Sequence, residues 1–129
     1  MTRARTTIQI KRVYEASEAG EGFRVLVDRL WPRGMTRERA KVDAWVKEVA
    51  PSTALRLWYG HDPERWEEFR ARYEAELAGT PALDDFRALV LAHDRVTLLY
   101  GAKVTDINHA VVLRDLLERP RENPGRTRA

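Results

Sequence analysis

The chain contains no cysteine among its 129 residues. This absence excludes disulfide bonds, thiolate metal sites and a cysteine nucleophile. The three histidines, His61, His93 and His109, are too scattered for their spacing to indicate a metal site. No apolar run approaches the ~18 residues that span a membrane, and the first residues lead into no signal-type apolar segment. We therefore expect a cytoplasmic protein that does not contact a membrane. The sequence assigns no metal-ligating residue, and it leaves open whether a metal joins through Asp28 or Asp106.

Sequence signatures of the common cofactor sites and nucleophiles are missing as well. There is no glycine-rich phosphate loop, no G-x-S-x-G nucleophile elbow and no dinucleotide fingerprint. The sequence therefore indicates no particular cofactor. It also leaves open whether the protein is an enzyme.

The basic character of the chain lies at its two ends. The formal net charge is +3, and the arginines of residues 1–7 and 119–129 supply more than this total. Residues 8–118 are therefore slightly acidic, and we interpret them as one α/β domain between two basic tails. The C-terminal tail is rich in proline, glycine and arginine, which predicts disorder.

Strand patterns recur along the chain. Residues 8–13 alternate apolar and polar side chains, residues 23–28 form an apolar run, and residues 95–100 are rich in β-branched and aromatic residues. The alternation over residues 42–47 favours a third strand, although a helix there fits nearly as well.

Helix signals fill the intervals between these strands. Thr36 is expected to cap a short turn over residues 37–40, and Ser52, Asp62 and Thr80 precede three longer apolar-periodic segments. Asp106 is expected to cap the last helix. Strands separated by helices predict a single small parallel or mixed sheet flanked by helices, the α/β class.

Polar side chains gather where three of the predicted strands end. The loops in question are residues 28–34, 47–52 and 101–109. In an open α/β sheet, ligands bind at the carboxyl ends of the strands, so parallel strands would bring these loops to one edge. Asp28 and His109 are the candidates for proton transfer. The candidate ligand-binding residues are Arg29, Trp31, Arg33, Gly34, Lys47, Ser52, Lys103 and Asn108.

These residue types favour an anionic ligand. The planar arginine fork grips phosphate or carboxylate through two hydrogen bonds, and the start of the last helix attracts negative charge. The first hypothesis is a phosphate-bearing ligand, either a nucleotide or a nucleic-acid end, with hydrolysis or group transfer as the reaction. One alternative is a non-catalytic nucleic-acid-binding accessory protein that uses Trp31 and the tails. In a second alternative, the polar cluster only orders the loops.

Four ordered motifs carry a resemblance to a known family: D-R-L-W-P-R-G over residues 28–34, K-E-V-A-P-S over 47–52, W-Y-G-H-D-P over 58–63, and L-L-Y-G-A-K over 98–103 followed by N-H-A-V-V-L over 108–113. Over residues 8–118 the chain resembles the YeaO-like branch of the domain of unknown function 488 family. The resemblance implies a compact α/β domain and no assigned activity. Some longer members of the wider family carry a cysteine in the later loop, which this chain lacks.

Overall fold

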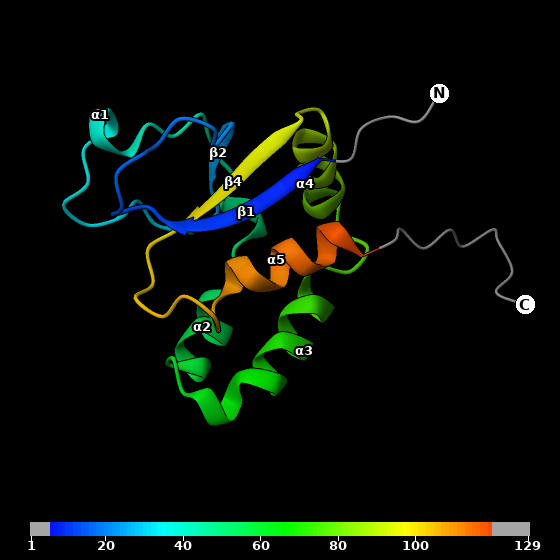
Figure 1. The fold of residues 1–129 in the computed structure, drawn as a ribbon. Helices are drawn as coiled ribbons and strands as arrows, with labels where there is room; N and C mark the ends of the chain where they lie inside the picture. The colour runs from blue at the N-terminus through cyan, green and yellow to red at the C-terminus, as the bar shows by residue number, and fades with distance from the viewer. Residues whose placement is uncertain (1–5, 120–129) are drawn as a thin grey trace, which may run out of the picture.

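Four parallel strands form the centre of the fold (Figure 1). The computed structural model describes residues 6–119, and its sheet has the order β1-β4-β2-β3. Every neighbouring pair is parallel, so the α/β prediction is confirmed and the sheet is parallel rather than mixed. The strands are β1 Thr7–Arg12, β2 Phe23–Leu26, β3 Ala44–Trp45 and β4 Arg95–Tyr100.

Within residues 6–119, five α-helices follow the cap signals of the sequence. Thr36, Ser52 and Thr80 each accept a backbone N–H at the start of a helix, and Asp62 does so at a 3-10 turn. The helices are α1 Arg37–Ala40, α2 Thr53–Tyr59, α3 Trp66–Leu77, α4 Pro81–Leu91 and α5 His109–Glu118, and the 3-10 turns are η1 Lys47–Val49 and η2 Pro63–Arg65.

The sheet is covered on both faces. Successive side chains of a strand point to opposite faces, so each strand contributes to two cores. On β4, Leu98 and Tyr100 join the larger core formed with α2, α3, α4 and α5. Leu99 faces the smaller core under the segment that carries α1, where it packs with Met35 and Ala40. Figure 1 shows α2, α3 and α5 grouped on one side of the sheet, with α1 set apart from them. Because β2 and β4 are parallel neighbours, their carboxyl ends lie at the same edge of the sheet.

The prediction for the start of the last helix is wrong. Asn108, not Asp106, is the N-cap of α5: its side chain accepts the Val111 N–H at 3.2 Å and donates to the Val104 carbonyl at 2.8 Å. Asp and Asn cap helices about equally well, so the sequence does not distinguish the two positions. The second hydrogen bond, to the preceding loop, decides between them.

The predicted third strand is present but short. Only Ala44 and Trp45 pair as strand residues with β2, and the N–H groups of Asp43 and Val46 extend the pairing by one hydrogen bond at each end. The chain then turns into η1 at Lys47. The pattern over residues 42–47 therefore contains a strand followed by the start of a helical turn.

The two predicted tails lie almost entirely outside the described residues. At the N-terminal side, β1 begins at Thr7, inside the segment assigned to the tail. At the C-terminal side, α5 ends at Glu118. Within residues 6–119, no helix has the length and apolar character needed to cross a membrane.

Candidate functional site

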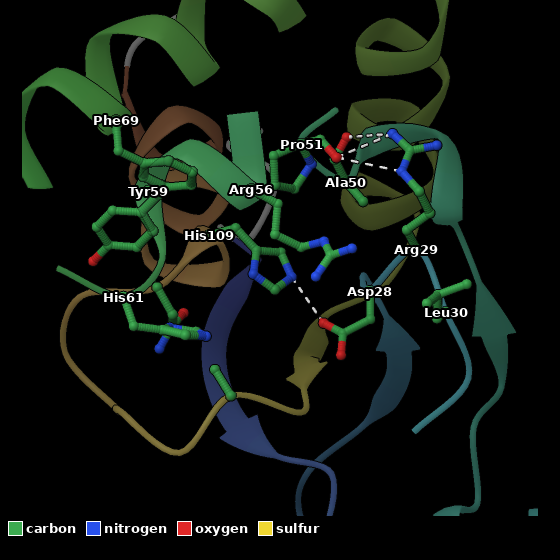
Figure 2. Close-up of a pocket in the computed structure, with 12 residues that line it drawn as sticks. Asp28, Arg29, Leu30, Ala50, Pro51, Arg56, Tyr59, His61, Phe69 and His109 are labelled. Carbon is green, nitrogen blue, oxygen red and sulfur yellow. Dashed lines mark hydrogen bonds and ion pairs between the residues drawn. The ribbon is translucent and has the colours of Figure 1, made fainter. Parts of the chain in front are cut away.

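A pocket of about 200 Å³ lies where the loops after β2 and β4 meet α2 and α5 (Figure 2). Half of its lining is apolar: Leu30, Ala50, Pro51, Tyr59, Phe69 and Ala102. The other half is polar: Asp28, Arg29, Arg56, His61, Asn108 and His109. Concave sites with a mostly apolar wall and a few converging polar groups are typical of ligand pockets.

Asp28 and His109 form the polar centre of this pocket. Asp28 follows β2 and His109 is the first residue of α5, so the parallel sheet brings together two residues that are distant in sequence. The His109 Nε2 and Asp28 Oδ1 atoms lie 2.8 Å apart. Both atoms are buried, and the orientation of the two groups gives neither a well-formed hydrogen bond. The carboxylate and the imidazole are therefore in close polar contact without being locked by a directional bond.

The remaining contacts of Asp28 fix its position. Its Oδ2 atom accepts the Gly101 N–H at 2.9 Å, and its backbone carbonyl accepts the Trp45 indole N–H at 2.7 Å. A Cβ atom at Gly101 would lie 2.9 Å from the same Oδ2, so glycine lets the two strand-end loops approach this closely. Asp28 thus orders the loops, as the structural alternative expects, and also lines the pocket.

Arg29 uses its guanidinium on the protein itself. Nε donates to the Pro51 carbonyl, and Nη2 donates to the carbonyls of Ala50 and Pro51, at 3.1–3.3 Å. Figure 2 shows this fork directed at the loop before α2. Arg29 therefore holds one wall of the pocket in place.

Arg56 and His61 line the pocket with side chains that make no hydrogen bond within residues 6–119. Within residues 6–119, the Arg56 guanidinium has neither a hydrogen bond nor an ion pair, and Figure 2 shows it beside His109. The imidazole of His61 has only a ring contact with Tyr59, at 6.0 Å between centroids. Its backbone has a φ of +60°, in the left-handed region that non-glycine residues rarely occupy. Such strain is often stored at binding sites.

Tyr59 forms the aromatic wall together with Phe69. Their rings stack with centroids 4.3 Å apart. The Tyr59 hydroxyl donates to the Ile107 carbonyl at 2.9 Å, which joins α2 to the loop before α5. Burial, followed by the nearby carboxylates of Asp106 and Asp62, raises the pKa of Tyr59. The phenol therefore remains a neutral hydrogen-bond donor at neutral pH.

The structure brings together four of the ten predicted site residues: Asp28, Arg29, Asn108 and His109. The other six lie outside the pocket lining. Lys103 and Arg33 have exposed side chains, and Gly34 lies in an exposed turn with a φ of +76°. Of the predicted cationic side chains, only that of Arg29 lines the pocket, and its guanidinium already donates to backbone carbonyls.

The last three predicted residues hold local structure. Ser52 caps α2 and donates from its hydroxyl to Glu76 at 2.6 Å. The Trp31 indole donates to the Met35 carbonyl at 2.7 Å, and its ring packs edge-on against Trp45. Lys47 places its ammonium over the Trp45 ring, 5.1 Å from the centroid.

Comparisons with known proteins place the chain in a family. Residues 7–127 match the family described as "Inactive DUF488-N3 subclade". This chain belongs to that family. It is 44% identical over 110 residues to YeaO, an uncharacterised protein of Escherichia coli K12, a match that covers 85% of this chain and 96% of YeaO.

Similar relatives occur in mycobacteria. The chain is 43% identical over 112 residues to the uncharacterised protein Rv3073c of Mycobacterium tuberculosis, which covers 87% of this chain and 94% of the relative. The uncharacterised protein Mb3100c of Mycobacterium bovis matches to the same extent. No solved structure matches the chain. These relatives support the YeaO-like assignment made from the four motifs.

The rule that ligands bind at strand ends does not predict two of the pocket residues of this DUF488-N3 domain. Arg56 lies inside α2, where an exposed arginine is indistinguishable from any solvated helix residue. His61 precedes the helix start at Asp62 and is only a minor candidate on the sequence pattern. The sequence signal that could have paired Arg56 with His61 is their spacing of five residues across Gly60. The left-handed Gly60 and His61 turn the chain back beside the end of α2. Among residues 6–119, no three metal-ligating side chains are grouped to hold an ion.

Proposed function

We propose that this protein binds a small phosphate-bearing ligand in the pocket between α2, α5 and the loops after β2 and β4. The observation that carries this proposal is the Arg56 guanidinium, which lines the pocket without a partner within residues 6–119. A guanidinium fork matches phosphate oxygens with two charge-assisted hydrogen bonds. In this proposal, Arg56 takes the role that was predicted for Arg29, Arg33, Lys47 and Lys103.

Two neighbours strengthen the preference for an anion. The imidazole of His61 lines the same space and offers a ring N–H as a further hydrogen-bond donor. His109 is the first residue of α5, so the positive end of that helix dipole faces the same space. The overall arrangement favours a ligand whose charged group lies among Arg56, His61 and the start of α5.

Binding, rather than turnover, is the function that fits best. The family to which the chain belongs is described as inactive. The Asp28–His109 pair has the composition of a proton-transfer pair, and in this proposal it recognises the ligand instead. Hydrolysis or group transfer remains the activity to assay once a ligand is found.

Titration calorimetry with inorganic phosphate and adenosine 5′-monophosphate tests the proposal, with thermal unfolding as a second readout. A probe at about a hundred times its dissociation constant adds roughly 2.7 kcal/mol of stability, which raises the melting temperature by several degrees. Arg56→Ala should weaken binding at least about tenfold, because it removes a charge-assisted contact.

Arg33→Ala is the matched control. It removes the same side chain from an exposed position outside the pocket lining, and should leave the affinity unchanged. Equal binding by wild type and Arg56→Ala would refute the proposal, as would equal losses in both variants. The second result would indicate general electrostatic attraction.

A further inference from the structure

The carboxylate of Asp28 is the unexpected member of an anion-binding pocket. It lines the same space as Arg56 and His61, and its side chain is 20% exposed. A carboxylate repels a phosphate group and accepts hydrogen bonds from hydroxyl or amino groups. A pocket that took a bare phosphate would therefore be weakened by Asp28, whereas a ligand that also carries a hydrogen-bond donor would gain from it.

The hydrogen bonds of the Asp28–His109 pair indicate which donor fits. Asp28 Oδ2 already accepts the Gly101 N–H, while Asp28 Oδ1 and His109 Nε2 have no hydrogen bond within residues 6–119. Their mutual contact at 2.8 Å is not a well-formed hydrogen bond, and buried polar atoms that lack one cost stability. A hydroxyl group donates one hydrogen bond and accepts others. Placed beside the pair, it would donate to Oδ1 and accept from Nε2–H, satisfying both atoms.

A ligand can reach these two atoms only when the two side chains separate. Each shields the other at 2.8 Å, and no directional hydrogen bond holds them together. The inference requires the His109 ring to rotate toward the pocket, which would separate the two atoms. The contact of Oδ2 with Gly101 keeps the carboxylate in place during this rotation.

The dimensions of the pocket limit the remainder of the ligand. Its volume of about 200 Å³ is below the roughly 300 Å³ at which pockets for drug-sized ligands begin. The aromatic wall of Tyr59 and Phe69 and the neighbouring Pro51 offer apolar surface to a short carbon frame. A frame of a few carbons or a single small ring fits, and a complete nucleotide would extend out of the pocket.

We infer that the ligand is a small hydroxylated phosphate monoester, with its phosphate at Arg56 and a hydroxyl group at the Asp28–His109 pair. This inference rests on the proposed function and names the chemical class of its ligand. Free polyol or sugar phosphates and the sugar–phosphate part of a nucleotide share this chemistry. Adenosine 5′-monophosphate distinguishes these two sources, because its base must lie outside the pocket. Tighter binding of the nucleotide than of glycerol 3-phosphate would indicate a nucleotide ligand, and weaker binding would indicate a free polyol or sugar phosphate.

Calorimetric titration of the wild-type protein with glycerol 3-phosphate and propyl phosphate tests the inference directly. The two probes share a three-carbon frame and a phosphate, and only the first has hydroxyl groups. We expect glycerol 3-phosphate to bind at least about tenfold more tightly. Equal affinity for both probes would overturn the inference while leaving phosphate binding intact. Failure of both probes to bind, together with phosphate and adenosine 5′-monophosphate, would overturn the proposed function as well.

Asp28→Asn tests whether the Asp28 carboxylate causes the preference for glycerol 3-phosphate over propyl phosphate. The tenfold preference should disappear in this variant, while propyl phosphate should bind no more weakly than before, because a repelling charge has been removed. Asp106→Asn, an exposed carboxylate on the loop before α5 that does not line the pocket, is the control and should retain the preference. Retention of the full preference in Asp28→Asn would overturn the assignment. The comparison of the two probes on wild-type protein decides the inference even if Asp28→Asn does not fold.

Discussion

Gly22→Ala should destabilise the fold severely, whereas Gly79→Ala should have a small effect. Both glycines are left-handed, with φ of +72° and +74°. An alanine in that conformation costs about 1–2 kcal/mol at either position. The two sites differ only in what surrounds the added methyl group, so the difference between the two variants isolates the steric contribution.

At Gly22 the added Cβ atom would lie 2.1 Å from the carbonyl oxygen of Arg95 and 2.7 Å from its carbonyl carbon. Both atoms belong to the backbone at the start of β4, so no side-chain rotation relieves the clash. The chain before β2 must move away, which disturbs the Phe23↔Val96 pairing and the hydrogen bond from the Thr97 hydroxyl to the Glu21 carbonyl. At Gly79 nothing lies within 4 Å of the added atom.

The magnitude follows from these two contributions. Overpacking typically costs ~1–3 kcal/mol, and a lost hydrogen bond adds about 1 kcal/mol. We therefore expect Gly22→Ala to lose about 2–4 kcal/mol more than Gly79→Ala. Domains of this kind have total stabilities of roughly 5–15 kcal/mol, so the loss is a large part of the whole.

Urea unfolding followed by tryptophan fluorescence measures this difference through the transition midpoints. Gly34→Ala is a second control, because Gly34 has a φ of +76° and open space around it. Losses within about 0.5 kcal/mol of each other for all three variants would refute the reasoning, since only the left-handed backbone would then matter.

Two further predictions concern buried polar groups. Tyr73→Phe removes the hydroxyl that donates to the Val49 carbonyl in the core; it should cost about 1–3 kcal/mol in urea unfolding, and unchanged stability would contradict this. Burial alone would raise the pKa of Glu21, but hydrogen bonds from Lys11 and Arg24 outweigh it and lower the pKa below its ordinary value near 4.5. The ionised carboxylate therefore stabilises the fold fully above about pH 4.5, and this contribution is lost as the pH falls through the lowered pKa. Midpoints measured from pH 7 to pH 3 should fall more steeply for wild type than for Glu21→Gln, and parallel profiles would be the contrary result.

Local patterns predicted most of the secondary structure, because each depends on neighbours in the sequence. Proline after Asp62 and after Thr80 places two helical starts without knowledge of the fold. The prediction failed where two local solutions were equivalent. Asp106 and Asn108 are both good caps, and the hydrogen bond from Asn108 to the Val104 carbonyl decides between them.

The candidate site was predictable in part for a similar reason. Parallel strands bring their carboxyl ends to one edge, which is why Asp28 and His109 could be placed together from the sequence. The direction of a long side chain is not determined by its position in a loop. Arg29 turns to the carbonyls of Ala50 and Pro51, and Lys47 lies over the ring of Trp45.

The sequence by itself determined the family and the α/β class and pointed to Asp28 and His109 as candidates, because motifs and the alternation of strands with helices are properties of the linear chain. Only the tertiary structure decided which cation is available to a ligand. That choice depends on which carbonyls and carboxylates surround each guanidinium or ammonium group after folding. Arg56, a residue of α2 that lies outside the four motifs, lines the pocket unpaired within the described residues because α2 packs beside the strand ends.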